Sequence, residues 1–134
     1  ARIPTRPRLP TPEDVVQVLA PLCGKDHERF WCLPMDTRMR LIGEPIEVTR
    51  GDIDGTDAGP RAFFRNALRA GATSVVAAHN HPTGVVDPSP ADLAVTRRLA
   101  AAGRTVDCPL QDHVIVVPGG GFTSLRRDNP DLFR

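Results

Sequence analysis

The stretch TSVVAAHNHPTGVVDPSPAD, residues 73–92, decides the predicted fold of this chain. It begins with a short, uninterrupted apolar run with β-branched residues, which is typical of a central strand covered on both faces. The run ends in two histidines one residue apart, a Pro-Thr-Gly turn follows, and Ser-Pro-Ala-Asp then begins a helix. The stretch therefore predicts a strand, a loop and a helix in succession, with polar side chains gathered between them.

The segments on the N-terminal side of this stretch predict a helix and a β-hairpin. The helix begins after the N-cap residue Thr11 and ends at Gly24. Residues 29–35 and 40–51 predict the two strands of the hairpin. Pro45, inside the second strand, indicates an edge position or a bulge, because proline cannot donate a backbone hydrogen bond to a neighbouring strand.

Two further helices and two further strands complete the predicted fold. Residues 59–71 predict a helix whose buried face consists of Phe63, Phe64, Ala67 and Leu68. Residues 89–103 predict a helix that Gly103 ends. The segments HVIVV, residues 113–117, and FTSL, residues 122–125, predict strands. This order of elements predicts the α/β class, with one mixed β-sheet flanked by helices on its faces.

The length and composition are those of one globular domain. The chain has 134 residues, of which 40% are hydrophobic and 25% are charged. We expect residues 1–10, which are rich in proline, to form an extended arm and residues 11–134 to form a single domain.

The sequence favours a cytoplasmic protein without a membrane partner. Its apolar stretches are far shorter than the roughly 18 residues that a membrane-spanning helix needs. The N-terminal segment is basic and lacks the apolar core of a signal peptide. The three cysteines, Cys23, Cys32 and Cys108, are odd in number and form no Cys-x-x-Cys pair. They are therefore interpreted as reduced thiols, with a cysteine-ligated structural zinc as the alternative.

The charge distribution gives weak support to a nucleic-acid partner. The formal net charge is +1, and aromatic residues make up 4% of the chain. Arg61, Arg65 and Arg69 recur every fourth residue and would form one stripe on a helix. We favour a solvated helix face for this stripe, and the alternative is a patch for phosphate or for an acidic partner.

The two histidines and a following aspartate predict a metal site. His79 and His81 lie two residues apart at the end of the predicted strand, so both side chains point to the same face. Asp92 lies in the first turn of the next helix and can point toward the histidines. Two histidines and one carboxylate leave a fourth tetrahedral position open, which is the pattern of catalytic zinc sites. The alternative is a plain helix start, in which Ser89 and Asp92 form a capping box and the histidines are incidental.

These residues resemble a known family. His-x-His, seven residues and then Ser-x-x-Asp match the JAMM signature of the JAB/MPN metalloprotease superfamily. The wider pattern AHNHPTG, PSPADLAVTRRLAAAG, DHVIV and FTSL is similar to the RadC-like branch, over about residues 30–125. The resemblance implies the JAB/MPN, cytidine-deaminase-like architecture. RadC-like proteins usually carry an additional N-terminal helical region, so the chain resembles an isolated catalytic-type domain or a short variant.

The resemblance also implies residue roles. His79, His81 and Asp92 would be the ligands of Zn²⁺, and Ser89 would help to hold the reacting water or the oxyanion. A glutamate of the hairpin would be the general base, for which we favour Glu47 over Glu44. A third outcome is that neither glutamate reaches the metal. His113, in the segment DHVIV, is interpreted as a structural residue at the start of a strand, with a place near the site as the alternative.

Together these features predict a zinc-dependent metallohydrolase of the JAMM type, a peptidase or isopeptidase that acts on a protein or peptide. Zinc-activated water would attack the amide carbonyl, and the glutamate would accept its proton. The alternative function is a non-catalytic protein-binding module or a DNA-repair-associated module of the RadC family. An exposed hairpin edge also predicts that two copies could pair as a homodimer.

Overall fold

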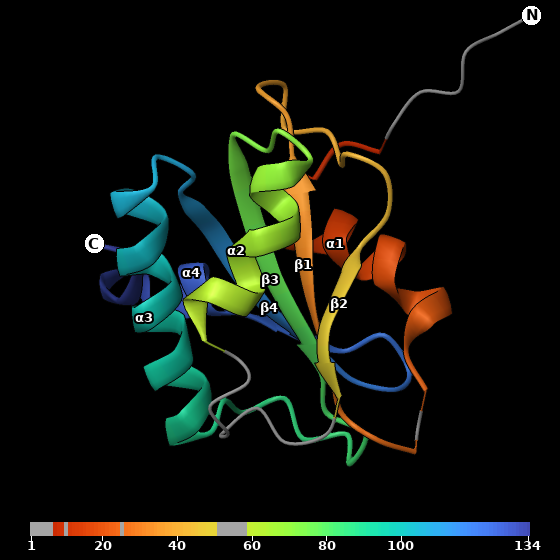
Figure 1. Cartoon of the computed structure of the whole chain (residues 1–134). Coiled ribbons are helices and arrows are strands. Elements are labelled where there is room, and N and C mark those ends of the chain that lie inside the picture. Colours follow the sequence, from red (N-terminus) through yellow and green to blue (C-terminus); the bar gives the residue numbers. More distant parts are fainter. Residues whose placement is uncertain (1–6, 10, 25, 51–58) are drawn as a thin grey trace, which may run out of the picture.

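The computed structural model describes residues 7–9, 11–24, 26–50 and 59–134. Its centre is a five-stranded sheet in the order β2-β1-β3-β4-β5, covered by helices on both faces (Figure 1). The strands are β1 (Arg29–Met35), β2 (Ile46–Arg50), β3 (Ser74–Asn80), β4 (Leu110–Val116) and β5 (Phe122–Ser124). β3 and β4 are parallel and the other neighbours are antiparallel, so the predicted mixed sheet and α/β class are confirmed.

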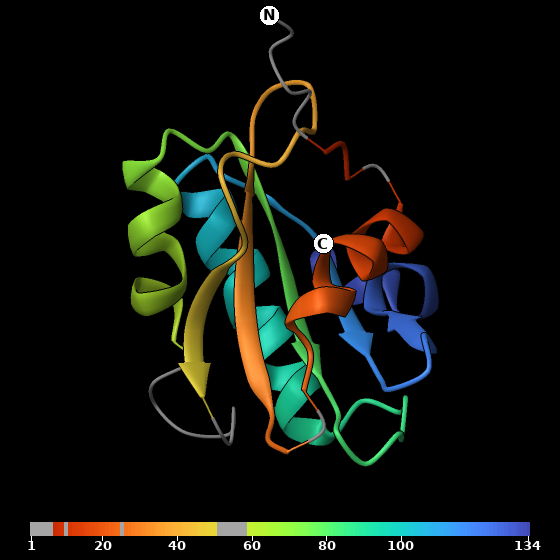
Figure 2. The ribbon, with the colours of Figure 1, turned by 90° about the vertical axis from the view of Figure 1, so that its right-hand side faces the viewer.

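The main helices are α1 (Pro12–Leu19), α2 (Pro60–Arg69) and α3 (Pro90–Thr105). α2 and α3 cover one face of the sheet and α1 covers the other (Figure 2). A short helix η1 (Ala20–Leu22) follows α1, and α4 (Leu125–Asp128) and η3 (Pro130–Phe133) end the chain. The sequence does not predict α4 or η3, because four-residue helices carry too little periodicity to be recognised.

β3 is the buried centre of the fold, as its apolar run predicts. All seven of its residues are buried. Successive side chains point to opposite faces, so Val75 and Ala77 pack in the core under α2 and α3, whereas Val76 and Ala78 pack in the core under α1. Each fully buried valine stabilises the fold by about 1.5–3 kcal/mol relative to an exposed one. This strict alternation also decides the face to which each residue after Ala78 points.

α3 does not end at Gly103 as predicted but continues to Thr105. Gly103 is buried inside the helix, and a Cβ atom there would lie 2.7 Å from the backbone oxygen of Cys108 and 3.2 Å from Cζ of Phe64. The glycine therefore serves close packing of α3 against its neighbours. A glycine that permits such an approach cannot be distinguished by sequence from one that ends a helix.

The second hairpin strand is shorter than predicted. β2 begins at Ile46, while Leu41 forms only an isolated bridge to Met35. β2 is an edge strand, as Pro45 indicates, and the register with β1 shifts between Phe30 and Trp31. The shift lies beyond Pro45, so the proline marks the start of the strand rather than the bulge.

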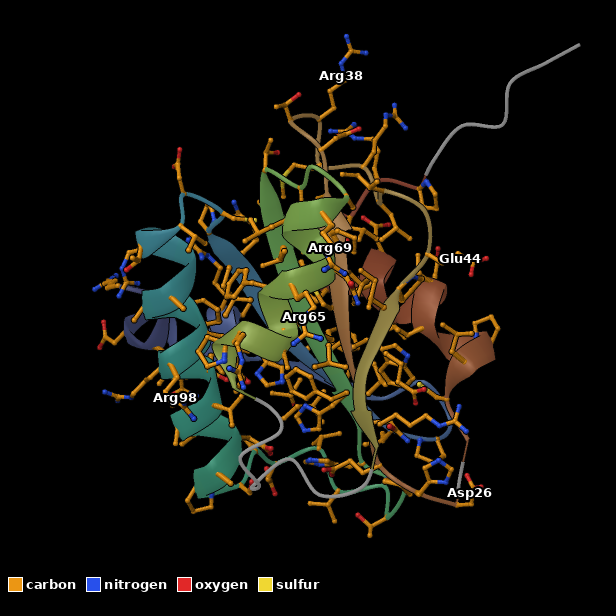
Figure 3. All side chains as sticks on the ribbon, viewed as in Figure 1. Asp26, Arg38, Glu44, Arg65, Arg69 and Arg98 are labelled. Carbon is orange, nitrogen blue, oxygen red and sulfur yellow. The ribbon has the colours of Figure 1, made fainter. Side chains whose placement is uncertain are left out.

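α2 presents arginines to the solvent and aromatic residues to the core. Phe63, Phe64 and Ala67 are buried, but Leu68 is 45% exposed, so its predicted burial is wrong. Leu68 lies at the edge of the buried stripe, between the buried Ala67 and the exposed Arg69. The arginine stripe of Arg61, Arg65 and Arg69 is exposed, and Figure 3 shows Arg65 and Arg69 on the outer side of the helix.

The end of the predicted arm packs onto the hairpin. The backbone N–H of Leu9 donates to the carbonyl of Met39, and the N–H of Leu41 donates to the carbonyl of Pro7. Leu9 is buried as a result. Residues 1–6 and 10 of the arm lie outside the described residues.

The structure also bears on the state of the cysteines and on whether a helix could cross a membrane. Cys23, Cys32 and Cys108 are free thiols, as predicted, and the last two are buried. Among the described residues, no helix combines the length and the apolar character that crossing a membrane requires.

Candidate metal centre

The predicted ligand residues converge at the carboxyl end of β3. The Nε2 atoms of His79 and His81 lie 3.0 Å apart. Oδ1 of Asp92 lies 3.3 Å from Nε2 of His79, and Oδ2 lies 3.4 Å from Nε2 of His81. The side chains of His79 and Asp92 are 0% and 2% exposed, whereas His81 is 13% exposed. The cluster therefore opens toward solvent on the side of His81.

Local backbone structure brings these residues together. His79 lies on the α2 and α3 face of β3, and His81 follows the last residue of that strand. Gly84, with a φ of +87°, allows the chain to turn, and its N–H donates to the carbonyl of His81. α3 then begins with a capping box, in which the N–H of Ser89 donates to Oδ2 of Asp92 at 2.8 Å. The capping box thus holds the Asp92 carboxylate, so the helix cap and the candidate ligand are one arrangement.

A chain of buried hydrogen bonds fixes the ring of His79. The hydroxyl of Thr96 donates to the backbone oxygen of Asp92 at 2.7 Å, so its oxygen accepts from Nδ1–H of His113 at 2.6 Å. Nε2 of His113 then carries a lone pair and accepts from Nδ1–H of His79 at 2.8 Å. The remaining nitrogen of His79, Nε2, therefore directs a lone pair toward Asp92.

His81 is oriented in the same way by a backbone carbonyl. Nδ1 of His81 lies 2.7 Å from the oxygen of Val85, which can only accept a hydrogen bond. Nδ1 therefore carries the proton, and Nε2 faces His79 with a lone pair. Two imidazole lone pairs and a carboxylate that face one another repel unless a cation or a proton lies between them. Such a set of nitrogen and oxygen donors fits Zn²⁺.

The pKa values agree with this arrangement. Burial raises the pKa of Asp92, but its interactions with the imidazole groups of His79 and His81 outweigh burial and hold the pKa far below the ordinary value. The hydrogen bond with Asp92 raises the pKa of His81, because in the metal-free protein a proton occupies the space between the donors. Burial lowers the pKa of His113 well below the ordinary value, and the nearby His79 adds to this effect, so His113 stays neutral.

His113 is therefore not an isolated strand residue. It is fully buried, and its side chain contacts the ring of His79 directly. His113 lies in the middle of β4 and not at the start of the strand, and the structure places it beside the candidate site, where it orients the ring of His79.

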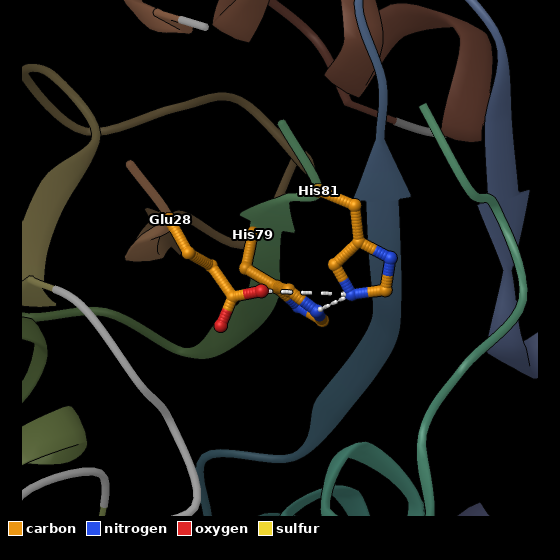
Figure 4. Close-up of side chains that lie close together, drawn as sticks. All are labelled: Glu28, His79 and His81. Carbon is orange, nitrogen blue, oxygen red and sulfur yellow. Dashed lines mark hydrogen bonds and ion pairs between the residues drawn. The ribbon is translucent and has the colours of Figure 1, made fainter. Parts of the chain in front are cut away.

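Glu28, which the sequence analysis missed, lies beside the two histidines. One oxygen atom of its carboxylate is 3.7 Å from Nε2 of His81, and Glu28, His79 and His81 form a group of ligand atoms within 4.8 Å of one another (Figure 4). The pairing of Phe30 with His79 explains this position. Since β1 and β3 are antiparallel, the residue two places before Phe30 lies opposite the residue two places after His79 and on the same face.

Glu47 and Glu44 lie on the other face of the sheet. Glu47 pairs with Trp31, whose side chain packs in the core under α1, and directly opposed residues share a face. Its carboxylate lies 3.6 Å from Nε of Arg29, and both glutamates line a groove that α1 and η1 border. Figure 3 shows Glu44 on the outer side of the molecule. The structure therefore places the Glu28 carboxylate, and not that of Glu47 or Glu44, beside the histidines of the candidate metal centre.

Ser89 lies at the N-cap of α3, as predicted. Its Oγ accepts a hydrogen bond from the N–H of Asp92 at 3.1 Å. Its position supports Asp92, and its contact with water or an oxyanion stays a prediction.

Comparisons with known proteins identify the same family. The family described as "RadC-like JAB domain" matches residues 9–130. A UPF0758 protein of Cyanothece sp. is 48% identical over 100 residues, which are 75% of this chain and 40% of that protein. A UPF0758 protein of Acaryochloris marina is 41% identical over 125 residues, 90% of this chain and 51% of that protein. A UPF0758 protein of Delftia acidovorans is 44% identical over 119 residues, 88% of this chain and 52% of that protein.

The chain spans about half the length, or less, of these three relatives. The match to the family nevertheless includes β1 to β5 and all the residues of the candidate metal centre. On this match the chain belongs to the RadC-like JAB domain family.

Proposed function

We propose that this domain is a zinc-dependent hydrolase that cleaves an amide bond of a peptide or protein. One observation carries the proposal: the lone pairs of His79 and His81 and the carboxylate of Asp92 converge, with the Glu28 carboxylate beside them. Three donors with an open side and an adjacent carboxylate are the arrangement that metal-assisted hydrolysis needs.

Each residue has a defined task in this proposal. His79, His81 and Asp92 would hold the ion, and the hydrogen bonds that the histidine rings donate, from Nδ1–H of His79 to His113 and from Nδ1–H of His81 to the carbonyl of Val85, keep both rings in the metal-binding tautomer. A bound Zn²⁺ lowers the pKa of water from about 15.7 to about 7 and polarises a carbonyl group. Glu28, 24% exposed and at the open side of the cluster, would accept the proton of the attacking water and deliver it to the leaving amine.

The substrate class rests on the family resemblance. JAMM-type members of the superfamily imply a peptidase or isopeptidase, and the same resemblance implies that Ser89 stabilises the oxyanion. The position of Ser89 at the N-terminus of the sixteen-residue helix α3 is consistent with this task, because helix N-termini favour negative charge.

A hydrolysis screen tests the proposal. The zinc-loaded protein is incubated with a panel of peptides and isopeptide-linked conjugates, and cleavage is followed by mass spectrometry. We expect cleavage that a chelator abolishes and that added Zn²⁺ restores. A folded, zinc-loaded protein that cleaves nothing in a broad panel would contradict the proposal.

The exposed arginines of α2 favour a second candidate, a binding module for nucleic acid. Arg61, Arg65 and Arg69 follow one side of the helix, which contains no acidic residue. Such a stripe could contact successive phosphates, and each contact would make the affinity depend on salt. A fluorescence titration with a DNA duplex at two salt concentrations tests it, and absent or salt-independent binding would exclude it.

A further inference from the structure

Asn80 lies between the two histidines, but its side chain points to the opposite face of the sheet. It is 1% exposed, and its amide makes three hydrogen bonds. Oδ1 accepts from the backbone N–H of Arg29 at 2.7 Å. Nδ2 donates to the carbonyl of His27 at 3.1 Å and to that of Gly24 at 3.4 Å. All three partners belong to the segment that leads from η1 into β1.

Two of these hydrogen bonds lie on either side of Glu28, and we call this pair the bracket. The carbonyl of His27 belongs to the peptide group before Glu28, and the N–H of Arg29 belongs to the peptide group after it. Both peptide groups are therefore tied to β3 at the residue that separates the two candidate ligands. The Glu28 side chain leaves this bracket toward the other face of the sheet, where it approaches His81.

The side chains on either side of Glu28 contact each other and not the histidine cluster. Nε–H of Arg29 donates to Nε2 of His27 at 3.1 Å, and Nη1 of Arg29 donates to the carbonyl of Leu22. Alternation along the segment thus separates Glu28 from its neighbours. The bracket fixes the backbone orientation in which Glu28, and neither His27 nor Arg29, points to the candidate metal centre.

The chemistry of the bracket requires a carboxamide. One short side chain must accept from an N–H and donate to carbonyls at the same time, which asparagine does with its oxygen and its NH₂ group. Aspartate would offer no donor to the two carbonyls, and an apolar residue would leave buried backbone groups without a partner.

We propose that Asn80 is a positioning residue for Glu28, which it holds in register with His79 and His81. The inference rests on the proposed function, in which Glu28 is the general base. Asn80 would fix the distance from the base to the metal, although its side chain lies on the opposite face of the sheet.

Amide hydrogen exchange of the metal-free protein, followed by NMR, tests the bracket itself. In Asn80→Ala the Arg29 amide should exchange roughly two- to tenfold faster, as expected for the loss of one hydrogen bond, while the amides of β4 keep their protection. Thr123→Val is the matched control, because Oγ1 of Thr123 also holds a nearby loop, through the carbonyl of Val86 at 2.8 Å. It should leave the Arg29 amide unchanged. If Asn80→Ala does not fold, Asn80→Ser retains one hydrogen-bonding group and takes its place.

The pH dependence of the visible absorption of the cobalt-loaded protein tests the link to Glu28. We expect Glu28→Gln to shift the midpoint of this dependence, Asn80→Ala to shift it in the same direction, and the double variant to shift it no further. Thr105→Val, which removes an exposed hydrogen bond to Ala101 at the C-terminal end of α3, should keep the midpoint of the unmodified protein. Additive shifts, or a shift with Glu28→Gln and none with Asn80→Ala, would overturn the inference alone.

The two experiments separate this inference from the proposed function. A protein that binds no cobalt would contradict the proposed metal site, whereas faster exchange of the Arg29 amide in Asn80→Ala would still support the bracket. An unchanged Arg29 amide, or an equal loss of protection throughout β4, would overturn the inference whether or not metal binds.

Discussion

The two faces of the sheet differ at the place where β3 ends and β1 begins. On the α2 and α3 face, Glu28, His79 and His81 bring together side chains that could hold a metal ion. On the α1 face, Asn80, Arg29 and Glu47 form hydrogen bonds and an ion pair that hold the backbone. Glu28 alternates with Arg29 at the start of β1, and Asn80 alternates with His79 and His81 at the end of β3. A shift of one residue in register would therefore exchange the two sets.

This contrast shows why residue type alone does not identify the glutamate that we propose as the general base. Glu28 and Glu47 are both partly exposed glutamates next to β1, and both lie near a cationic or ionisable partner. Only the face to which each points distinguishes them.

The largest expected effect separates the two glutamates. Glu28→Gln should lower turnover by about 10²–10⁴-fold, because the proton acceptor is lost, and should leave the metal content unchanged. Glu47→Gln, on the other face, should retain full turnover. Turnover of the substrate found in the hydrolysis screen gives the comparison, and equal losses in both variants would contradict the assignment of the faces.

The next effect concerns the buried hydrogen bonds behind His79. Thr96→Val removes the acceptor of His113 Nδ1–H, so the ring of His79 loses its fixed tautomer. Zinc affinity should fall by about 10- to 100-fold, as is typical for residues that orient metal ligands. Competition with a chromophoric chelator measures this affinity. Thr105→Val, which removes an exposed hydrogen bond to Ala101 on the same helix, is the control and should retain the affinity.

The affinity of the candidate site for zinc should depend on pH. The pKa of His81 is raised mainly by Asp92, so zinc must displace its proton. Affinity should therefore fall by about tenfold per pH unit as the pH decreases below that raised pKa. Asp92 adds no further loss there, because its pKa lies far below the ordinary value. Isothermal titration over a pH series measures the slope, and a flat profile would contradict the role of His81.

The free energy of unfolding of the metal-free protein should change with pH in the opposite direction and decrease as the pH rises. Because the pKa of His81 is higher in the folded state, its contribution to stability is complete below the pKa of the unfolded chain. The contribution is lost as the pH rises through the folded-state value. Urea denaturation of the metal-free protein at several pH values measures this change, with His81→Ala as the control that should remove it.

The smallest effect is expected on the α1 face. The ion pair between Glu47 and Arg29 is partly exposed, with side-chain exposures of 31% and 26%. Glu47→Ala should therefore change the free energy of unfolding by about 0–1 kcal/mol. Urea denaturation measures the change, and a loss of several kcal/mol would indicate that the α1 face depends on this carboxylate more than its exposure suggests.

The parts of the site that the sequence predicted are local. The spacing of His79, His81 and Asp92 follows from one strand end, one turn and one capping box, all within fourteen residues. Glu28 depends on the pairing of β1 with β3, whose partners Phe30 and His79 are far apart in the sequence. That pairing cannot be read from either segment alone. The alternation around Phe30 was the available signal, because a core residue at position 30 places residue 28 on the same face.

The fold shows the same division between local and non-local information. The bounds of β1 and β3 follow from apolar runs, and the start of α1 follows from its cap at Thr11. Gly103 was misread because its role depends on the approach of Cys108 and Phe64 from other elements. Leu68 was misread because burial depends on the angle at which α2 meets the sheet.

The zinc content of the purified protein tests the central claim most directly. Elemental analysis of the unmodified chain after exposure to Zn²⁺ should give about one zinc per chain, as expected for a site with two histidines and a carboxylate. The variant with both His79→Ala and Asp92→Asn should give none while its circular dichroism spectrum keeps the helix and strand signal. A folded, unmodified protein that retains no zinc would contradict the account, and the segment from His79 to Asp92 would then be only a turn and a helix cap.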